Sequence, residues 1–161
     1  MHKLKLYLDT SAISHLYQLD APDKMSDTLA LWKYIISDEY YAVISEVTAR
    51  ELMNAPEPKR SIIADYLNQA NFKMLSVTSE VNELAQEIIR RGILTLKSFD
   101  DCMHIATAIL SNCDIIVSWN FKHLVNIKTI NGVREIVVSR YYKPIDIYTP
   151  TVLLKGDESH G

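Results

Sequence analysis

Glycine is scarce in this chain of 161 residues, which contains only four. It has no glycine-rich phosphate loop and no Rossmann fingerprint, so nucleotide binding through those motifs is excluded. Cysteine is equally rare, and Cys102 and Cys113 fall within one expected helix. At roughly 1.5 Å per residue they lie about 16 Å apart, too far to pair. We therefore expect two reduced core cysteines in a cytoplasmic protein.

Long apolar runs are also absent, because no stretch approaches the roughly 20 residues that a membrane span needs. The start of the sequence shows no signal peptide, and we expect no membrane association. An excess of positive charge is lacking too: the formal net charge is −3, which argues against a general nucleic-acid coating protein. A nuclease stays compatible with this charge, because bound divalent ions supply positive charge.

Apolar residues make up 48% of the chain, enough for one globular domain with a real core. Apolar runs predict strands over 4–8, 41–45, 73–77, 115–118 and 136–139. Between them, helical spacing predicts helices over 10–17, 26–37 (capped by Ser26), 46–54, 59–70, 81–91 and 101–112. This alternation indicates an α/β fold with a mainly parallel sheet of about five strands.

Four polar clusters are spread along this pattern, most of them where a strand ends or a helix begins. They are Asp9-Thr10-Ser11, Glu51, Asp100-Asp101 and Ser118-Trp119-Asn120. Because the carboxyl ends of parallel strands share one edge, these clusters are expected to meet in one pocket. Three carboxylates and a carboxamide without a basic partner repel one another unless a hard cation, Mg²⁺ or Mn²⁺, holds them. The sequence therefore predicts a metal site suited to phosphate chemistry.

Each cluster also has a purely structural interpretation. Asp9 is a helix N-cap candidate, and one of Asp100 and Asp101 is expected to cap the next helix. Asn120 is a typical turn residue after a strand. Spacing alone leaves open whether Glu51 or Glu46 belongs to the site, and which aspartate does.

Neighbouring side chains are expected to support these acids. Thr10 and Ser11 can bond the carboxylate of Asp9 and fix its rotamer. His104 lies three residues after Asp101 on the same helix face, as a core residue or as a supporting donor. His123 can reach a phosphate or cap the short turn after the fourth strand.

With these residues in this order, the sequence resembles the PIN-domain ribonucleases, particularly the single-domain toxins of VapBC-type toxin–antitoxin pairs. The matching segments are Tyr7-Leu8-Asp9-Thr10-Ser11, Ser45 through Glu51-Leu52, Asp101 with His104-Ile105-Ala106-Thr107-Ala108, and Ile116-Val117-Ser118-Trp119-Asn120-Phe121. Their order and spacing agree over roughly residues 4–138. Each motif is short, but the ordered set is fairly specific.

The resemblance implies a three-layer α/β/α domain with an acidic metal pocket. It places a PIN-like nuclease domain at 1–140 and makes 141–161 a C-terminal extension of the same domain, with a frayed tail from Lys155. It selects Asp9, Glu51 and Asp101 as the metal-binding acids, with Ser11 and Ser118 as hydroxyl neighbours. The fourth position, most often Asp in the family, is Asn120 here, whose oxygen can ligate a cation without adding charge. We therefore expect weaker occupancy by a second ion.

The resulting hypothesis is a Mg²⁺- or Mn²⁺-dependent endoribonuclease with RNA as substrate. Its catalytic residues would be Asp9, Glu51, Asp101 and Asn120, with Arg50, Lys122 and His123 as contacts to backbone phosphates. The resemblance also implies a small antitoxin partner and a homodimer. One alternative is a catalytically weak or silent PIN-like module that binds RNA or protein, favoured by Asn120 and by the acidic net charge. A phosphotransferase of the haloacid-dehalogenase kind is disfavoured, because it expects an Asp where Ser11 stands.

Overall fold

The computed structural model describes residues 3–158 and contains one parallel sheet. Its strands are β1 (Lys5–Leu8), β2 (Tyr41–Ser45), β3 (Phe72–Leu75), β4 (Ile115–Val117) and β5 (Asp146–Tyr148). They lie in the order β3-β2-β1-β4-β5, and all four neighbouring pairs are parallel. The expected α/β class with a five-stranded parallel sheet is confirmed.

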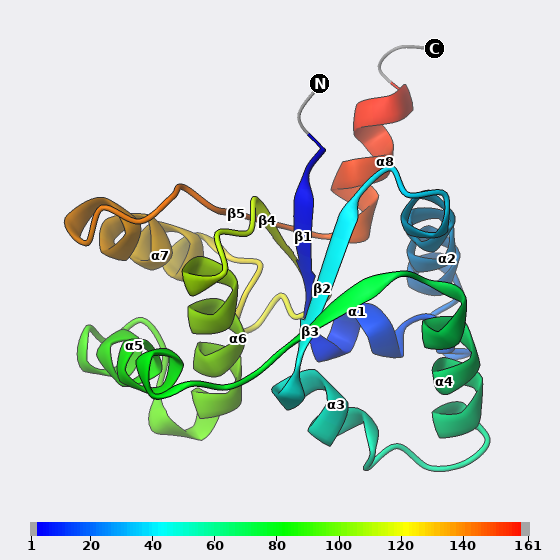
Figure 1. The fold of residues 1–161 in the computed structure, drawn as a ribbon, viewed down its shortest axis with the longest axis horizontal. Helices are drawn as coiled ribbons and strands as arrows, with labels where there is room; N and C mark the ends of the chain where they lie inside the picture. Colours follow the sequence, from blue (N-terminus) through cyan, green and yellow to red (C-terminus); the bar gives the residue numbers. More distant parts are fainter. Residues whose placement is uncertain (1–2, 159–161) are drawn as a thin grey trace.

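Helices cover both faces of the sheet and complete three layers (Figure 1). They are α1 (Thr10–Ser14), α2 (Pro22–Ile36), α3 (Glu46–Leu52), α4 (Lys59–Gln69), α5 (Ser79–Arg90), α6 (Phe99–Leu110), α7 (Ile127–Ser139) and α8 (Pro150–Glu158), with a short 3-10 helix at Leu96–Ser98. Helices α5, α6 and α7 pack on one face, and α1, α2, α4 and α8 on the other. Both α1 and α3 begin directly after strands, so they lie at the carboxyl edge of the sheet.

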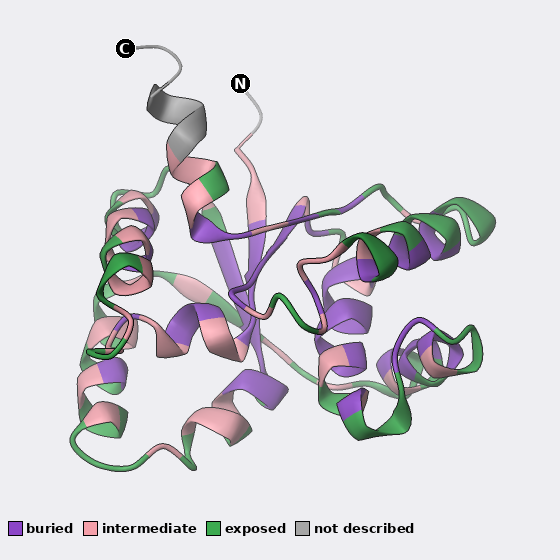
Figure 2. Ribbon diagram, turned by 180° about the vertical axis from the view of Figure 1, so that it is seen from behind, coloured by how far each residue is buried: buried purple, intermediate pink, exposed green. Residues whose placement is uncertain are grey.

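Alternation along the strands divides the core in two. In β1 the fully buried Tyr7 points to the α5–α7 side, while Leu6 and Leu8 point to the opposite side. Tyr7 is in register with Val43 of β2 and Ile116 of β4, so the central row of the sheet is apolar on this side. Figure 2 shows the three central strands, β1, β2 and β4, largely buried between the two helical layers. This packing fixes β1, and with it the position of the residue that follows, Asp9.

Three expected elements differ from the structure. The apolar run 136–139 is the last turn of α7, and the fifth strand is β5, which has only three residues. Ser26 lies inside α2, which begins at Pro22 because proline suits the first helical position. Helix α1 ends at Ser14, short of the expected end at 17.

The segment after α7 is part of the fold, because β5 extends the sheet beside β4 and α8 packs against α2. Residues 155–158, expected to fray, are helical, and the remainder of the expected frayed tail lies outside the described residues. Within residues 3–158, no helix is both long enough and apolar enough to cross a membrane.

Candidate active site

Asp9 follows the central strand and is the most deeply buried acid at this edge, with 3% of its surface exposed. It caps α1: its Oδ1 accepts a hydrogen bond from the Ala12 N–H (2.9 Å) and another from Ser11 Oγ (2.7 Å). Its Oδ2 accepts from Ser118 Oγ (2.6 Å). Burial nevertheless raises the pKa of Asp9 above its ordinary value, because these neutral donors and the more distant His104 compensate it only in part.

Glu51 reaches the same edge from α3, whose N-cap is Ser45 at the end of β2. Its Oε1 accepts hydrogen bonds from Thr10 Oγ1 (2.6 Å) and from His104 Nε2 (2.9 Å). Partial burial raises the pKa of Glu51, but these two bonds outweigh burial, and the net shift is downward. Of the two hydroxyl residues after Asp9, Thr10 therefore holds Glu51, and only Ser11 bonds the carboxylate of Asp9. Glu46, the rival in the sequence, is exposed and accepts from the Val77 N–H (2.9 Å).

His104 is oriented by a buried hydrogen-bond chain. Its Nδ1 lies 2.6 Å from the hydroxyl of Tyr7, which in turn lies 2.8 Å from Ser45 Oγ. Burial raises the pKa of Tyr7, so the phenol stays protonated and can donate to His104. The other ring nitrogen then carries the proton that is donated to Glu51. Only 2% of His104 is exposed.

Asp101 enters from the first turn of α6, and Ser98, rather than either aspartate, occupies the N-cap position of that helix. Its Oδ2 lies 2.9 Å from His123 Nδ1. Burial raises the pKa of Asp101; His104 and His123 lower it, and the charge of Asp9 raises it further. The adjacent Asp100 instead points outward and forms an exposed ion pair with Arg50 (2.7 Å). The two neighbouring aspartates therefore have different environments.

Asn120 lies in the turn after β4, and its side chain forms a hydrogen bond within that turn. Its Oδ1 accepts from the His123 N–H (3.0 Å), and its own N–H donates to Ser118 Oγ (2.9 Å). This contact matches the structural interpretation of Asn120 as a turn residue. Lys122, two positions further on, is exposed.

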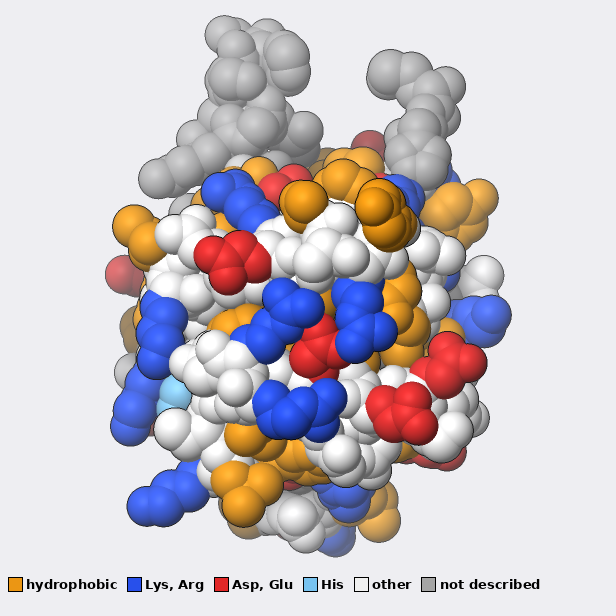
Figure 3. Space-filling model, turned by 90° about the vertical axis from the view of Figure 1, so that its left-hand side faces the viewer, with side chains coloured by type: hydrophobic (Ala, Val, Ile, Leu, Met, Phe, Trp, Pro, Cys, Tyr) orange, Lys and Arg blue, Asp and Glu red, His pale blue; other side chains and the backbone are white. Residues whose placement is uncertain are grey.

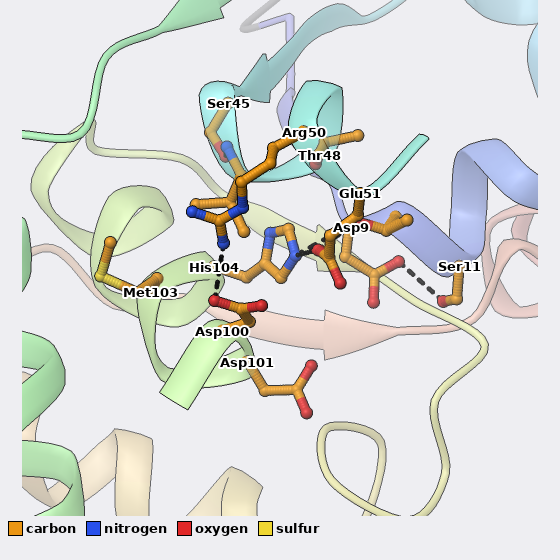
Figure 4. A network of polar contacts seen from close by, with 12 residues as sticks. Asp9, Ser11, Ser45, Thr48, Arg50, Glu51, Asp100, Asp101, Met103 and His104 are labelled. Carbon is orange, nitrogen blue, oxygen red and sulfur yellow. Dashed lines mark hydrogen bonds and ion pairs between the residues drawn. The ribbon is translucent and has the colours of Figure 1, made fainter. Parts of the chain in front are cut away.

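The three acids surround one histidine. The Nε2 of His104 lies 2.9 Å from Glu51, Asp101 precedes His104 by one turn of α6, and His104 lowers the pKa of Asp9 from a greater distance. Figure 4 shows their side chains entering one space from β1, α3 and α6. The premise that these acids lack a basic partner is wrong for two of them: His104 contacts Glu51, and His123 contacts Asp101. These pairs join positions 53 and 22 residues apart, so the contacts were invisible in the sequence.

A divalent ion fits the chemistry of this donor set. Carboxylate oxygens are the ligands that Mg²⁺ prefers. A cation would offset both the burial that chiefly raises the pKa of Asp101 and the smaller repulsion by Asp9. Within the part of the chain that the structure describes, however, no three His, Cys, Asp or Glu side chains are grouped as a ready-made metal site. The fit therefore concerns donor type and charge.

Comparisons with known proteins agree with this fold. Curated protein sequences provide no match to the chain. Sixteen chains in solved structures match it. One belongs to the crystal structure of VapBC2 from Rickettsia felis bound to a DNA fragment from their promoter; it is 16% identical, with a TM-score of 0.50 over 74% of this chain and 90% of that chain. At this identity the likeness concerns the fold alone. The model of the PIN domain family matches residues 6–122, most of the sequence, and the chain therefore belongs to the PIN domain family.

Proposed function

We propose that this protein is a divalent-metal-dependent endoribonuclease. The observation that carries the proposal is the convergence of Asp9, Glu51 and Asp101 around His104 at the carboxyl edge of the sheet. PIN domains are generally nucleases, and the family match supports a hydrolase of this kind. The choice of RNA over DNA rests on the resemblance of the sequence to the ribonucleases of this family.

In this proposal, Asp9 and Asp101 hold a Mg²⁺ or Mn²⁺ ion, with Asn120 as a further oxygen ligand. When bound, such an ion lowers the pKa of a coordinated water and stabilises negative charge on the phosphate. An amide oxygen accepts two contacts, so the bond from the His123 N–H leaves Asn120 one further lone pair.

The side chains of the protein supply position and proton transfer. Ser11, Ser118 and the Ala12 N–H fix both oxygens of Asp9, so its carboxylate needs no reorganisation during the reaction. The lowered pKa of Glu51 keeps this side chain ionised at neutral pH, and Thr10 and His104 aim it at the same space. We assign Glu51 the role of accepting the proton of the attacking water.

Cleavage of a mixed pool of structured RNA tests this proposal, with EDTA, Mg²⁺ or Mn²⁺ present. We expect metal-dependent cutting by the wild-type protein and a loss of at least 100-fold in Asp9→Asn and Asp101→Asn. Asp100→Asn is the matched control, because Asp100 is the adjacent acid and pairs with Arg50 on the surface. Equal activity of Asp100→Asn and Asp101→Asn would contradict the assigned site.

A second function is favoured by the pairing of two acids with histidines and by the absence, among the described residues, of a ready-made metal cluster. It is a silent PIN-like module that binds RNA or protein without cutting. Isothermal titration with Mn²⁺ beside the cleavage assay separates the two functions. Binding of RNA without turnover under any metal condition supports the silent module, whereas cleavage lost on substitution of Asp9 rules it out.

We further propose that the protein acts as the toxin of a toxin–antitoxin pair and forms a homodimer, and that residues 1–140 and 141–161 make up one domain. The matching VapBC2 structure from Rickettsia felis supports the first point by its fold. Exposed Val138 and Tyr141, at and just beyond the end of α7, offer an apolar surface for a subunit contact. Growth arrest on expression, relieved by a co-expressed small neighbouring gene product, tests the toxin. Light scattering after size exclusion tests the dimer.

A further inference from the structure

A groove of about 430 Å³ lies between the segment before α6 and the start of α7. The side chains of Lys97, Lys122 and Lys128 line it, together with His123, Asn126 and Thr129. We call this cavity the basic groove. All three lysines are exposed, so their ammonium groups are available to a ligand from solvent. Its floor includes the buried, apolar Ile93 and Leu94.

The charge of the basic groove is not balanced locally. No carboxylate lines it, and within residues 3–158 none of the three lysines has a carboxylate oxygen within 4.0 Å of its ammonium group. Elsewhere basic side chains have carboxylates beside them: Figure 3 shows a face on which Lys and Arg side chains are numerous and carboxylates lie among them. Arg91 and Arg140 both pair with Glu87, for example. The basic groove is therefore suited to an anion from outside the chain.

The start of α7 adds to this positive potential. Asn126 is the N-cap of this helix of 13 residues and lines the groove with Lys128 and Thr129. Backbone N–H groups in the first turn of a helix carry partial positive charge and attract anions. The helix end and the lysines thus favour the same kind of ligand.

His123 connects the basic groove with the acidic site. Its ring lines the groove, and its Nδ1 lies 2.9 Å from Asp101 Oδ2. A strand of nucleic acid that has one phosphate beside Asp101 would therefore meet the three lysines on continuing past His123. Three separated cations along an open groove suit a polymer with repeated negative charges.

We propose that the basic groove binds the phosphate backbone of the RNA substrate beside the phosphodiester that is cut, an assignment that rests on the proposed ribonuclease function. The lysines contact phosphates without reading bases, so they contribute affinity rather than sequence specificity. Arg50, by contrast, pairs with Asp100 and does not line the basic groove.

Binding of a fluorescent single-stranded RNA, followed by anisotropy at several salt concentrations, tests the proposal. The Asp9→Asn background prevents cutting. The groove variant combines Lys97→Gln, Lys122→Gln and Lys128→Gln. The control removes the same charge through Lys33→Gln, Lys73→Gln and Arg134→Gln, which are exposed and do not line the groove.

Each phosphate contact contributes about 0.7 to the slope of log K against log salt for single strands. We expect the groove variant to lose about 2 from this slope and to bind at least tenfold more weakly at 0.1 M salt, with the control close to the parent. Equal slopes in groove and control variants would overturn the proposal. The experiments distinguish failure of the groove proposal from failure of the ribonuclease proposal. If the wild type cleaves RNA but the slope is unchanged in the groove variant, only the proposed role of the groove is rejected. The expected loss of slope in a protein that cuts no RNA rejects only the ribonuclease.

Discussion

Replacing Asp9 by Asn is expected to make the metal-free protein more stable while abolishing its response to metal. Burial raises the pKa of Asp9 above the ordinary value of 3.8, so the folded state holds this proton more tightly than the unfolded state. The stabilising contribution of Asp9 to the free energy of unfolding is therefore fully present below pH 3.8. It is lost as the pH rises through the pKa of Asp9 in the folded state. Asn has nearly the same shape, carries no charge and still accepts from the Ala12 N–H.

The size of the gain follows from two opposing effects. The substitution replaces a charged acceptor by a neutral one in the hydrogen bonds from Ser11 and Ser118, which weakens them. A hydrogen bond to a charged group contributes about 1.5–3 kcal/mol, and a bond between neutral groups about 0.5–1.5 kcal/mol. Removal of a buried charge acts in the other direction and is the larger effect, since the net pKa shift is upward. We expect a net gain of about 1 kcal/mol at pH 8, which raises Tm by about 2–4 °C in a domain of this size.

Urea and thermal unfolding at pH 4, 6 and 8, first in EDTA and then with Mg²⁺, measures both effects. An ion at 100 times its Kd stabilises the folded state by about 2.7 kcal/mol, so the wild-type Tm is expected to rise by about 5–10 °C and that of Asp9→Asn hardly at all. Asp100→Asn should respond to Mg²⁺ like the wild type. If Asp9→Asn is the less stable protein at pH 8 in EDTA, the reasoning from burial is refuted.

Three further substitutions or probes test other parts of the structure. Gly132→Ala in α7 would place a Cβ 2.5 Å from the Ile93 side chain. Overpacking costs about 1–3 kcal/mol and should exceed the gain in helix propensity of about 1 kcal/mol. Urea unfolding should therefore show a lower free energy of unfolding. Tyr7→Phe leaves the Nδ1 of buried His104 without its donor, and we expect the free energy of unfolding to fall by about 1–3 kcal/mol. An unchanged free energy of unfolding would contradict this. Burial raises the pKa of Cys102 and Cys113 to about 12, so a thiol reagent should label neither in the native protein at pH 8 and both in guanidinium; rapid native labelling would contradict this.

The order of elements was predictable because apolar periodicity is a local property of the sequence. The error at 136–139 shows where this fails. Ile136, Val137 and Val138 read as a strand, yet they close a helix in which Val138 is 75% exposed. The actual β5 has three residues, with a polar one at its start, so its pattern is too short to recognise. Its strand conformation depends on pairing with β4.

The acidic residues of the candidate site could be proposed from the sequence, but the contacts that they make could not. Asp9 stands out after an apolar strand, whereas the contact of His104 with Glu51 joins positions separated by 53 residues. Tyr7, whose hydroxyl contacts His104, was not predicted as a site residue, although a tyrosine two positions before Asp9 in the first strand was an available signal. Thr10 was expected beside Asp9 and holds Glu51 instead, because adjacent residues at the start of a helix point in different directions.

The parallel sheet has a consequence for when the acidic site can exist during synthesis. Asp9 is synthesised 109 positions before its partner Ser118, and β1 acquires β4 only after that second segment has been made. Pairings between such distant segments form slowly, because a long loop must close first. A nascent or truncated chain that ends before β4 therefore carries the acids without the arrangement that joins them. The proposed nuclease activity would therefore begin only after the segment that carries β4 has left the ribosome.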